Sequence, residues 1–266
     1  MNLTHTVRFA LAAATSIGAL LAATASQAAT VAALQDGKTI AWIDTDKKAV
    51  TGSVELAGGA ALVGIDVRPS DGKLYGLAKD GAIVVIDHKT GKWEKKSQLS
   101  EKLPDGATFA VDFNPVADRL RVIGSDGTSL RINVDDGKAT VDGKLKYAET
   151  DAAKGKTPKV TAVAYTNSFA GTKETALFDI DAAVGALVKQ APPNEGILNT
   201  VGMLGAKVDG AVAFDIWSDG KGGNTAWLMS GNTLHTVDLA SGAAKAVGAI
   251  GGLKGRTMDI AILPGM

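Results

Sequence analysis

The sequence of 266 residues predicts an all-β fold, a five-bladed β-propeller closed by pairing of its N- and C-terminal strands in one blade. Three observations lead to this prediction. A phrase recurs along the chain, short apolar runs alternate with glycine-containing turns, and the two chain ends resemble complementary parts of one repeat. Four blades, six blades or a seven-stranded sandwich pair are the weaker alternatives.

The recurring phrase is clearest in "GIDVRP", which begins at Gly64, and in "AVDFNP", which begins at Ala110. Weaker copies begin at Ala162, Ala211 and Thr257. When the third residues are aligned, they fall at positions 66, 112, 164, 213 and 259, with separations of 46, 52, 49 and 46 residues. Such a period with several short apolar runs is typical of propeller blades.

The first unit divides into four predicted strands, at about residues 62–68, 73–78, 82–87 and 92–98. The first of these alternates with the period of a strand. Asp80-Gly81 lies between the second and third strands, where it favours a hairpin turn because Gly readily adopts positive φ.

An Asp or Asn ends the third predicted strand of four units, at positions 44, 87, 133 and 238. In three of them a glycine follows four residues later, at Gly91, Gly137 and Gly242. We interpret this spacing as an Asx-type turn into the fourth strand, and not as a catalytic position.

The two ends of the chain predict the closure of the ring. The segment after residue 30 has a second, a third and a fourth strand, at Val31–Leu34, Thr39–Asp44 and Ser53–Leu56, but no first strand. The last segment, "GRTMDIAILP", is a first strand with nothing after it. Joined, the two segments make a fifth unit, and the shared blade removes free sheet edges.

The N-terminus predicts export. Arg8 precedes an Ala-rich apolar stretch, and Ser26-Gln27-Ala28 offers the small residues of a cleavage site. We therefore expect a signal peptide at residues 1–28, one propeller domain at residues 29–266, and a periplasmic or secreted protein. The rival interpretation is a membrane anchor, but the stretch is weakly hydrophobic and of signal-peptide length.

Composition excludes several classes of function. The 28 basic and 28 acidic residues leave no net charge to recruit nucleic acid. The absence of cysteine excludes disulfides and thiolate chemistry. No phosphate-loop, zinc-helix or other cofactor motif is evident. We expect a monomer with no transmembrane segment once the signal peptide is removed.

Several long phrases resemble a known family. They include "AVDFNPVADRLRV", "LRINVDDG", "AYTNSFAG" and "APPNEGILNTVG", and the resemblance covers residues 30–264. The family is the bacterial one catalogued as domain of unknown function 4394. The resemblance implies a secreted protein with a propeller-like β fold, and it implies no activity or site.

Three aspartates share the third position of the aligned phrase: Asp66, Asp112 and Asp259. This position is expected on the strand that lines the central channel, where three carboxylates could hold a hard cation such as Ca²⁺. The structural alternative is that each Asp accepts backbone N–H bonds or pairs with an arginine of the next blade. Three arginines are available as such partners: Arg68, Arg121 and Arg256.

Arg119, Arg121 and Arg131 form a second candidate cluster. Arg119 and Arg121 share one face of a strand, and Arg131 lies on the next strand. Guanidinium groups suit a carboxylate or phosphate ligand. They equally suit Asp112 or Asp118 within the protein, and this ion-pair interpretation is the favoured one.

These features predict a binding or scaffold module of the periplasm or cell envelope, with an unknown ligand or envelope component as its partner. The alternative is a metal-assisted hydrolase with a Ca²⁺-type ion held by the channel carboxylates. A structural protein of the envelope is the third possibility.

Overall fold

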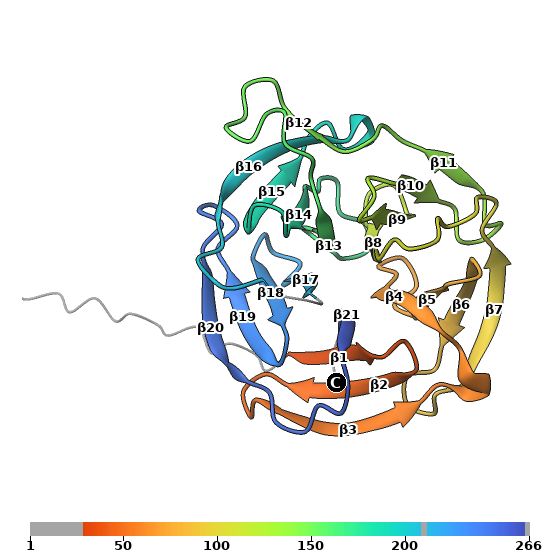
Figure 1. Cartoon of the computed structure of the whole chain (residues 1–266). Coiled ribbons are helices and arrows are strands. Elements are labelled where there is room, and N and C mark those ends of the chain that lie inside the picture. The colour runs from red at the N-terminus through yellow and green to blue at the C-terminus, as the bar shows by residue number, and fades with distance from the viewer. Residues whose placement is uncertain (1–28, 209–211, 264–266) are drawn as a thin grey trace, which may run out of the picture.

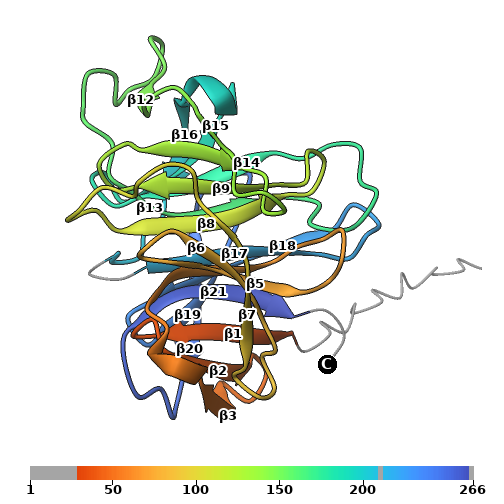
Figure 2. The ribbon, with the colours of Figure 1, turned by 90° about the vertical axis from the view of Figure 1, so that its right-hand side faces the viewer.

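The computed structural model describes residues 29–208 and 212–263, and the expected signal peptide lies outside this part of the chain. Five small, mainly antiparallel sheets surround a common axis (Figure 1). The side view in Figure 2 shows the inner strands running along this axis. The predicted five-bladed propeller is confirmed. No helix among the described residues is long and apolar enough to cross a membrane.

Each of the first two blades is formed by four consecutive strands, ordered from the axis outwards. Blade 1 contains β4 (Leu62–Val67), β5 (Leu74–Ala78), β6 (Ala82–Ile86) and β7 (Trp93–Gln98). Blade 2 contains β8 (Phe109–Asn114), β9 (Arg119–Gly124), β10 (Ser129–Ile132) and β11 (Ala139–Val141). In the first unit the predicted strands agree with these bounds to within one residue.

The third and fourth blades follow the same order, with one additional strand. Blade 3 contains β13 (Val160–Tyr165), β14 (Leu177–Asp181), β15 (Ala186–Gln190) and β16 (Ile197–Met203), and β12 (Lys146–Tyr147) pairs in parallel with β16. Blade 4 contains β17 (Val212–Ser218), β18 (Asn224–Ser230), β19 (Thr233–Val237) and β20 (Ala244–Ala249). Two 3-10 turns complete the elements, at Ala57–Gly59 and Pro193–Glu195.

Blade 5 joins the two ends of the described chain. It contains β21 (Thr257–Leu263), β1 (Thr30–Gln35), β2 (Thr39–Asp44) and β3 (Ala49–Glu55). Strand β21 pairs with β1 in antiparallel register from Thr30↔Leu263 to Gln35↔Thr257. Strand β3 begins at Ala49, whereas the sequence predicted a start at Ser53.

The hydrophobic core is divided among the contacts between neighbouring blades. Each of five buried clusters takes its side chains from both sheets that meet there. Between blades 1 and 2, for example, Tyr75 packs edge-on against Phe113, with 5.3 Å between ring centroids. Burial of these apolar faces is the main force that holds the ring together.

The turns between the third and fourth strands have the predicted Asx geometry. In blade 1, Asp87 Oδ1 accepts the Lys89 N–H at 3.0 Å, and the Gly91 N–H donates to the Asp87 carbonyl at 2.9 Å. Blade 2 repeats the arrangement with Asn133 and Gly137. The Asx-turn interpretation is confirmed.

The turn glycines also form the outer seam between blades. Gly137 has φ of 76°, its carbonyl accepts the Ser100 N–H at 2.9 Å, and a Cβ placed on it would overlap the carbonyl oxygen of Gln98 in blade 1. Gly91 stands in the same relation to Glu55 and Ala57 of blade 5. Glycine is required here because the neighbouring backbone occupies the side-chain position.

We predict that Gly137→Ala lowers the unfolding free energy by about 2 to 4 kcal/mol. The added methyl group would stand on a residue with left-handed backbone angles, and it would overlap the backbone of the neighbouring blade. Gly106→Ala is the matched control, because Gly106 has φ of 83° and no atom within 4 Å of an added Cβ. It should cost only about 1 kcal/mol. Urea unfolding measures both values, and equal losses would refute the role of the seam.

Candidate functional site

Aspartates on the inner strands bridge neighbouring blades around the axis. An inner strand is paired on one side only, so the N–H groups of its axial edge need other acceptors. Asp66 of β4 accepts the Phe113 N–H of β8 at 2.6 Å. Asp112 of β8 accepts the Tyr165 N–H of β13 at 3.0 Å.

The same bridge recurs at two further junctions. Asp215 of β17 accepts the Ile262 N–H of β21 at 2.6 Å, and Asp259 of β21 accepts the Ile65 N–H of β4 at 3.0 Å. The junction of blades 3 and 4 has Ala164 at the corresponding place. There, side-chain amides join the blades: Asn167 N–H donates to Asn224 Oδ1 at 2.8 Å, and Asn224 Nδ2 donates to Asn167 Oδ1 at 3.0 Å.

The bridges define which positions of the repeat are equivalent. Each of Asp66, Asp112 and Asp215 accepts a backbone N–H from the inner strand of the next blade. The donors are Phe113, Tyr165 and Ile262, and each donor comes one residue after the position that corresponds to the Asp in its own strand. The equivalent positions of the five inner strands are therefore 66, 112, 164, 215 and 261. The sequence alignment had used 213 and 259, which are two residues too early. A shift of two residues keeps the same face of the strand but moves the side chain about 6.6 Å along it.

The corrected register replaces Asp259 by Asp215, which the sequence analysis missed. A proline three residues after the aligned position signals the shift in the last strand, because Pro69 follows 66, Pro115 follows 112 and Pro264 follows 261, but no proline marks Asp215, which is followed at that spacing by Ser218. The alternation of apolar residues cannot reveal this error, because side chains alternate with a period of two and a shift of two residues leaves the pattern unchanged.

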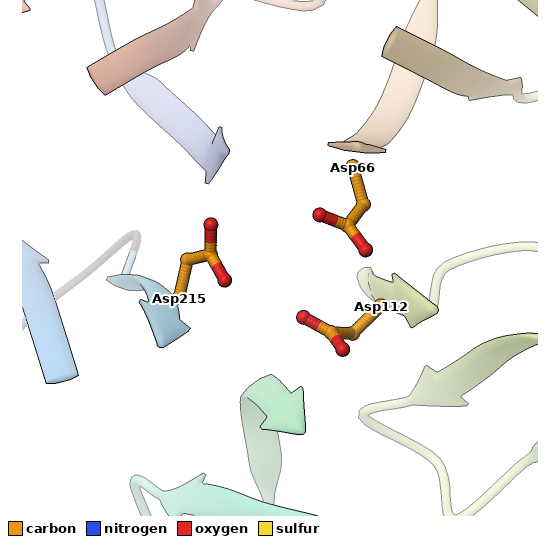
Figure 3. Close-up of side chains that lie close together, drawn as sticks. All are labelled: Asp66, Asp112 and Asp215. Carbon is orange, nitrogen blue, oxygen red and sulfur yellow. The ribbon is translucent and has the colours of Figure 1, made fainter. Parts of the chain in front are cut away.

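Asp66, Asp112 and Asp215, hereafter the channel triad, converge on the axis (Figure 3). Each contributes one carboxylate oxygen to a group whose members all lie within 4.8 Å of one another. All three residues are buried. Asp66 and Asp215 use both oxygens as backbone acceptors, whereas no described residue donates to Asp112 Oδ2.

The arginines expected as partners of these aspartates lie elsewhere. Arg68 pairs with Asp118 at 2.6 Å and with Asp135 at 3.1 Å. No Lys, Arg or His among the described residues forms an ion pair with the channel triad or with Asp259. The aspartates therefore act through backbone bonds between blades and lack a cationic side chain.

Burial without a counter-charge raises the pKa of every axial carboxyl. Burial raises the pKa of Asp215 to about 6. Burial is the main cause that holds the pKa of Asp66 well above its usual range, and repulsion from Asp215 adds to it. Burial likewise holds the pKa of Asp112 well above its usual range, with repulsion from Asp66 as the second cause. Burial also raises the pKa of Asp259. At neutral pH the channel triad therefore favours a bound proton or a bound cation.

The predicted arginine cluster divides. Arg121 and Arg131 converge on Asp142, with Arg121 Nη1 at 2.5 Å and Arg131 Nε at 2.7 Å from its Oδ2. Arg121 is 1% exposed and also donates to Tyr165 and Asn194, so it braces blade 2 against blade 3. Arg119 is not part of this group. It donates to the carbonyl oxygen of Asp118 at 2.8 Å.

A cavity of about 550 Å³, hereafter the cup, opens at the end of the axis where the inner strands begin. Its floor takes one residue from each inner strand, always three residues before the equivalent position of the repeat: Val63, Phe109, Thr161, Val212 and Met258. Its rim carries three exposed basic residues: Lys79, Lys159 and Arg256.

A smaller cavity of about 310 Å³ lies at the other end of the inner strands. Asp66 and Asp215 reach into its lining, together with Trp217 and the loop residues Ser168 and Phe169. The axis thus has a basic, partly apolar end and an acidic end. This asymmetry gives the two ends different ligand preferences.

The raised pKa values predict a pH dependence. A carboxyl whose folded-state pKa is raised stabilises fully below its unfolded pKa of 3.8 and loses that contribution as the pH rises through about 6, the folded value for Asp215. We therefore expect the unfolding free energy in metal-free buffer to fall between these pH values. The contribution of Asp215 is on the order of 3 kcal/mol.

Asp215→Asn should flatten this decline, whereas the exposed control Asp46→Asn should leave it unchanged. Urea midpoints taken across the interval measure the effect. Asp118 and Asp135 act in the opposite sense, since Arg68 lowers the pKa of each and their contribution is lost only below pH 3.8. A wild-type stability that rises across the interval would contradict buried, protonated carboxyls.

Three solved structures are similar to this chain, each at low sequence identity. A protein of unknown function from Bacteroides caccae is 15% identical, with 85% of this chain and 76% of that chain covered and a TM-score of 0.46. A second one, from Bacteroides thetaiotaomicron, is 14% identical, with 82% and 57% covered and a TM-score of 0.50. An auxiliary nutrient binding protein from the latter species is 14% identical, with 74% and 51% covered and a TM-score of 0.45.

No curated protein matches the chain. A family profile described as "Domain of unknown function (DUF4394)" matches residues 39–261, which include strands of all five blades. The resemblance noted from the phrases of the repeat is confirmed. The chain belongs to the DUF4394 family.

Proposed function

We propose that this protein is an exported binding propeller that captures a small molecule in the cup. The cup carries the proposal. Its volume of about 550 Å³ lies within the range of about 300 to 1,000 Å³ found for small-molecule sites. Because every inner strand contributes one residue to the floor, the whole ring holds the site rigid.

The lining of the cup suits binding. Apolar side chains such as Leu103, Phe109 and Met258 offer contact area, and the basic rim offers a charge to fix orientation. The N-terminal segment, with Arg8 before an apolar stretch and small residues ending at Ala28, supports a periplasmic or secreted location for this activity.

A neutral apolar dye tests the site. We expect Nile red to bind the wild-type protein with a blue shift of its emission, and Ala182→Trp to weaken this signal because Ala182 lines the cup and an indole there occupies part of it. Ala183→Trp is the matched control, since Ala183 is exposed and does not line the cup. Equal dye binding by the two variants would overturn the proposal.

A divalent cation held by the channel triad is the second candidate, and it is the first requirement of a metal-assisted hydrolase. It is favoured by the convergence of Asp66, Asp112 and Asp215 and by the unused Asp112 Oδ2. Oxygen ligands of this kind suit Ca²⁺, with water completing the shell. The ligand set contains Asp215 in place of the Asp259 expected from the sequence.

Chelator followed by Ca²⁺ tests this candidate. If the channel triad binds the ion, millimolar Ca²⁺ raises the melting temperature of chelator-treated protein, and a Ca²⁺ concentration 100 times Kd adds about 2.7 kcal/mol. Asp112→Asn should lose the shift. Asp259→Asn should keep it, because Asp259 also bridges two blades but lies outside the channel triad. No shift in the wild type removes the metal and the hydrolase together.

A further inference from the structure

We infer that the ligand of the cup is an anion with an apolar body, of the chemical class of a medium-chain alkyl carboxylate. The inference rests on the proposed function and adds the chemical class of its ligand. Three features of the cup carry it: a rim with more basic than acidic residues among those described, an apolar floor, and acidic groups beneath that floor.

The rim presents positive charge from three different blades. Lys79 lies in the turn after β5, Lys159 precedes β13, and Arg256 precedes β21. None of their side-chain nitrogens forms a hydrogen bond or ion pair with a described residue.

Asp105 also lines the cup, so among the described lining residues three basic groups face one acidic group. This excess of basic groups around the cavity favours an anionic ligand.

The floor offers little to a second polar group. Val63, Phe109, Val212 and Met258 are apolar, and Leu103 adds to the wall. The hydroxyl of Thr161 is turned to the backbone, where it donates to the Ile180 carbonyl at 3.4 Å. An apolar body that covers these side chains removes their surface from water, which is the favourable term in such a site.

The acidic residues set the orientation of the ligand. Asp259 directly follows Met258 of the floor. The residues of the channel triad come three residues after the floor position of their own strands, which is about 10 Å along the axis. No cationic side chain of the described residues pairs with these carboxyls, so this depth offers no counter-charge to an anionic group at the inner end of the ligand. The charged head therefore lies at the rim, and the apolar chain points toward the axis.

Displacement of Nile red tests the class of the ligand. We expect decanoate to displace the dye at a concentration about tenfold lower than decyltrimethylammonium, which has the same chain and the opposite charge; this preference corresponds to about 1.4 kcal/mol. The preference should shrink when the ionic strength is raised from about 0.01 M to about 1 M, because the rim is exposed and the Debye length falls from about 30 Å to about 3 Å.

Variants separate the rim from general surface charge. The triple variant K79Q/K159Q/R256Q should lose the preference for decanoate while still binding Nile red. The control K38Q/K189Q/K245Q removes three exposed lysines that do not line the cup, and it should keep the preference. The dye signal shows that both proteins are folded.

The outcomes distinguish the two proposals. If Nile red does not bind the wild type, the proposed function fails and the inference fails with it. If the dye binds but the two amphiphiles displace it equally, or if the rim variant keeps the preference, only the chemical class is overturned. A preference that is lost in the rim variant alone supports the inference.

Discussion

The unpaired axial edge of each inner strand is the constraint on which the ring depends. The inner strand of each blade is paired on one side only, and along its free edge buried N–H groups face the channel. Carboxylates of the preceding blade accept these protons at four of the five junctions. Each such bond joins the backbones of two sheets that share no ladder, so it fixes their relative height along the axis.

This device brings like charges together. Carboxylates that serve neighbouring edges at one level necessarily lie close to one another, and the channel triad results from this geometry. One level away, Gly64 has no side chain because a Cβ there would lie 2.8 Å from Asp259 Oδ2 and 2.7 Å from Val111 Cγ2. The axis is therefore ordered in layers, with the cup floor, Asp259 and the channel triad in succession. Structural bridges and candidate ligands are built from the same residues.

Local patterns in the sequence predicted most of the fold and only part of the site. The strands of blade 1 follow from alternation and turn dipeptides, since both act within a few residues. The register of Asp215 and Asp259 did not follow, because alternation cannot distinguish positions two residues apart. The cup has no local signature: Val63, Phe109 and Met258 meet only after the ring forms, and its rim charges come from separate loops. The sequence also did not predict the partner of Arg121, because Asp142 lies just after β11 and not on a strand next to Arg121 in the sequence.

The pairing of β21 with β1 affects the order in which the protein matures. Of the described elements, β1, β2 and β3 are synthesised first, yet the inner strand of their sheet, β21, is synthesised last. Until then, β1 has an open edge and the Asp215 carboxylate lacks the Ile262 N–H that it will accept. The ring of blades therefore cannot close before β21 has been synthesised.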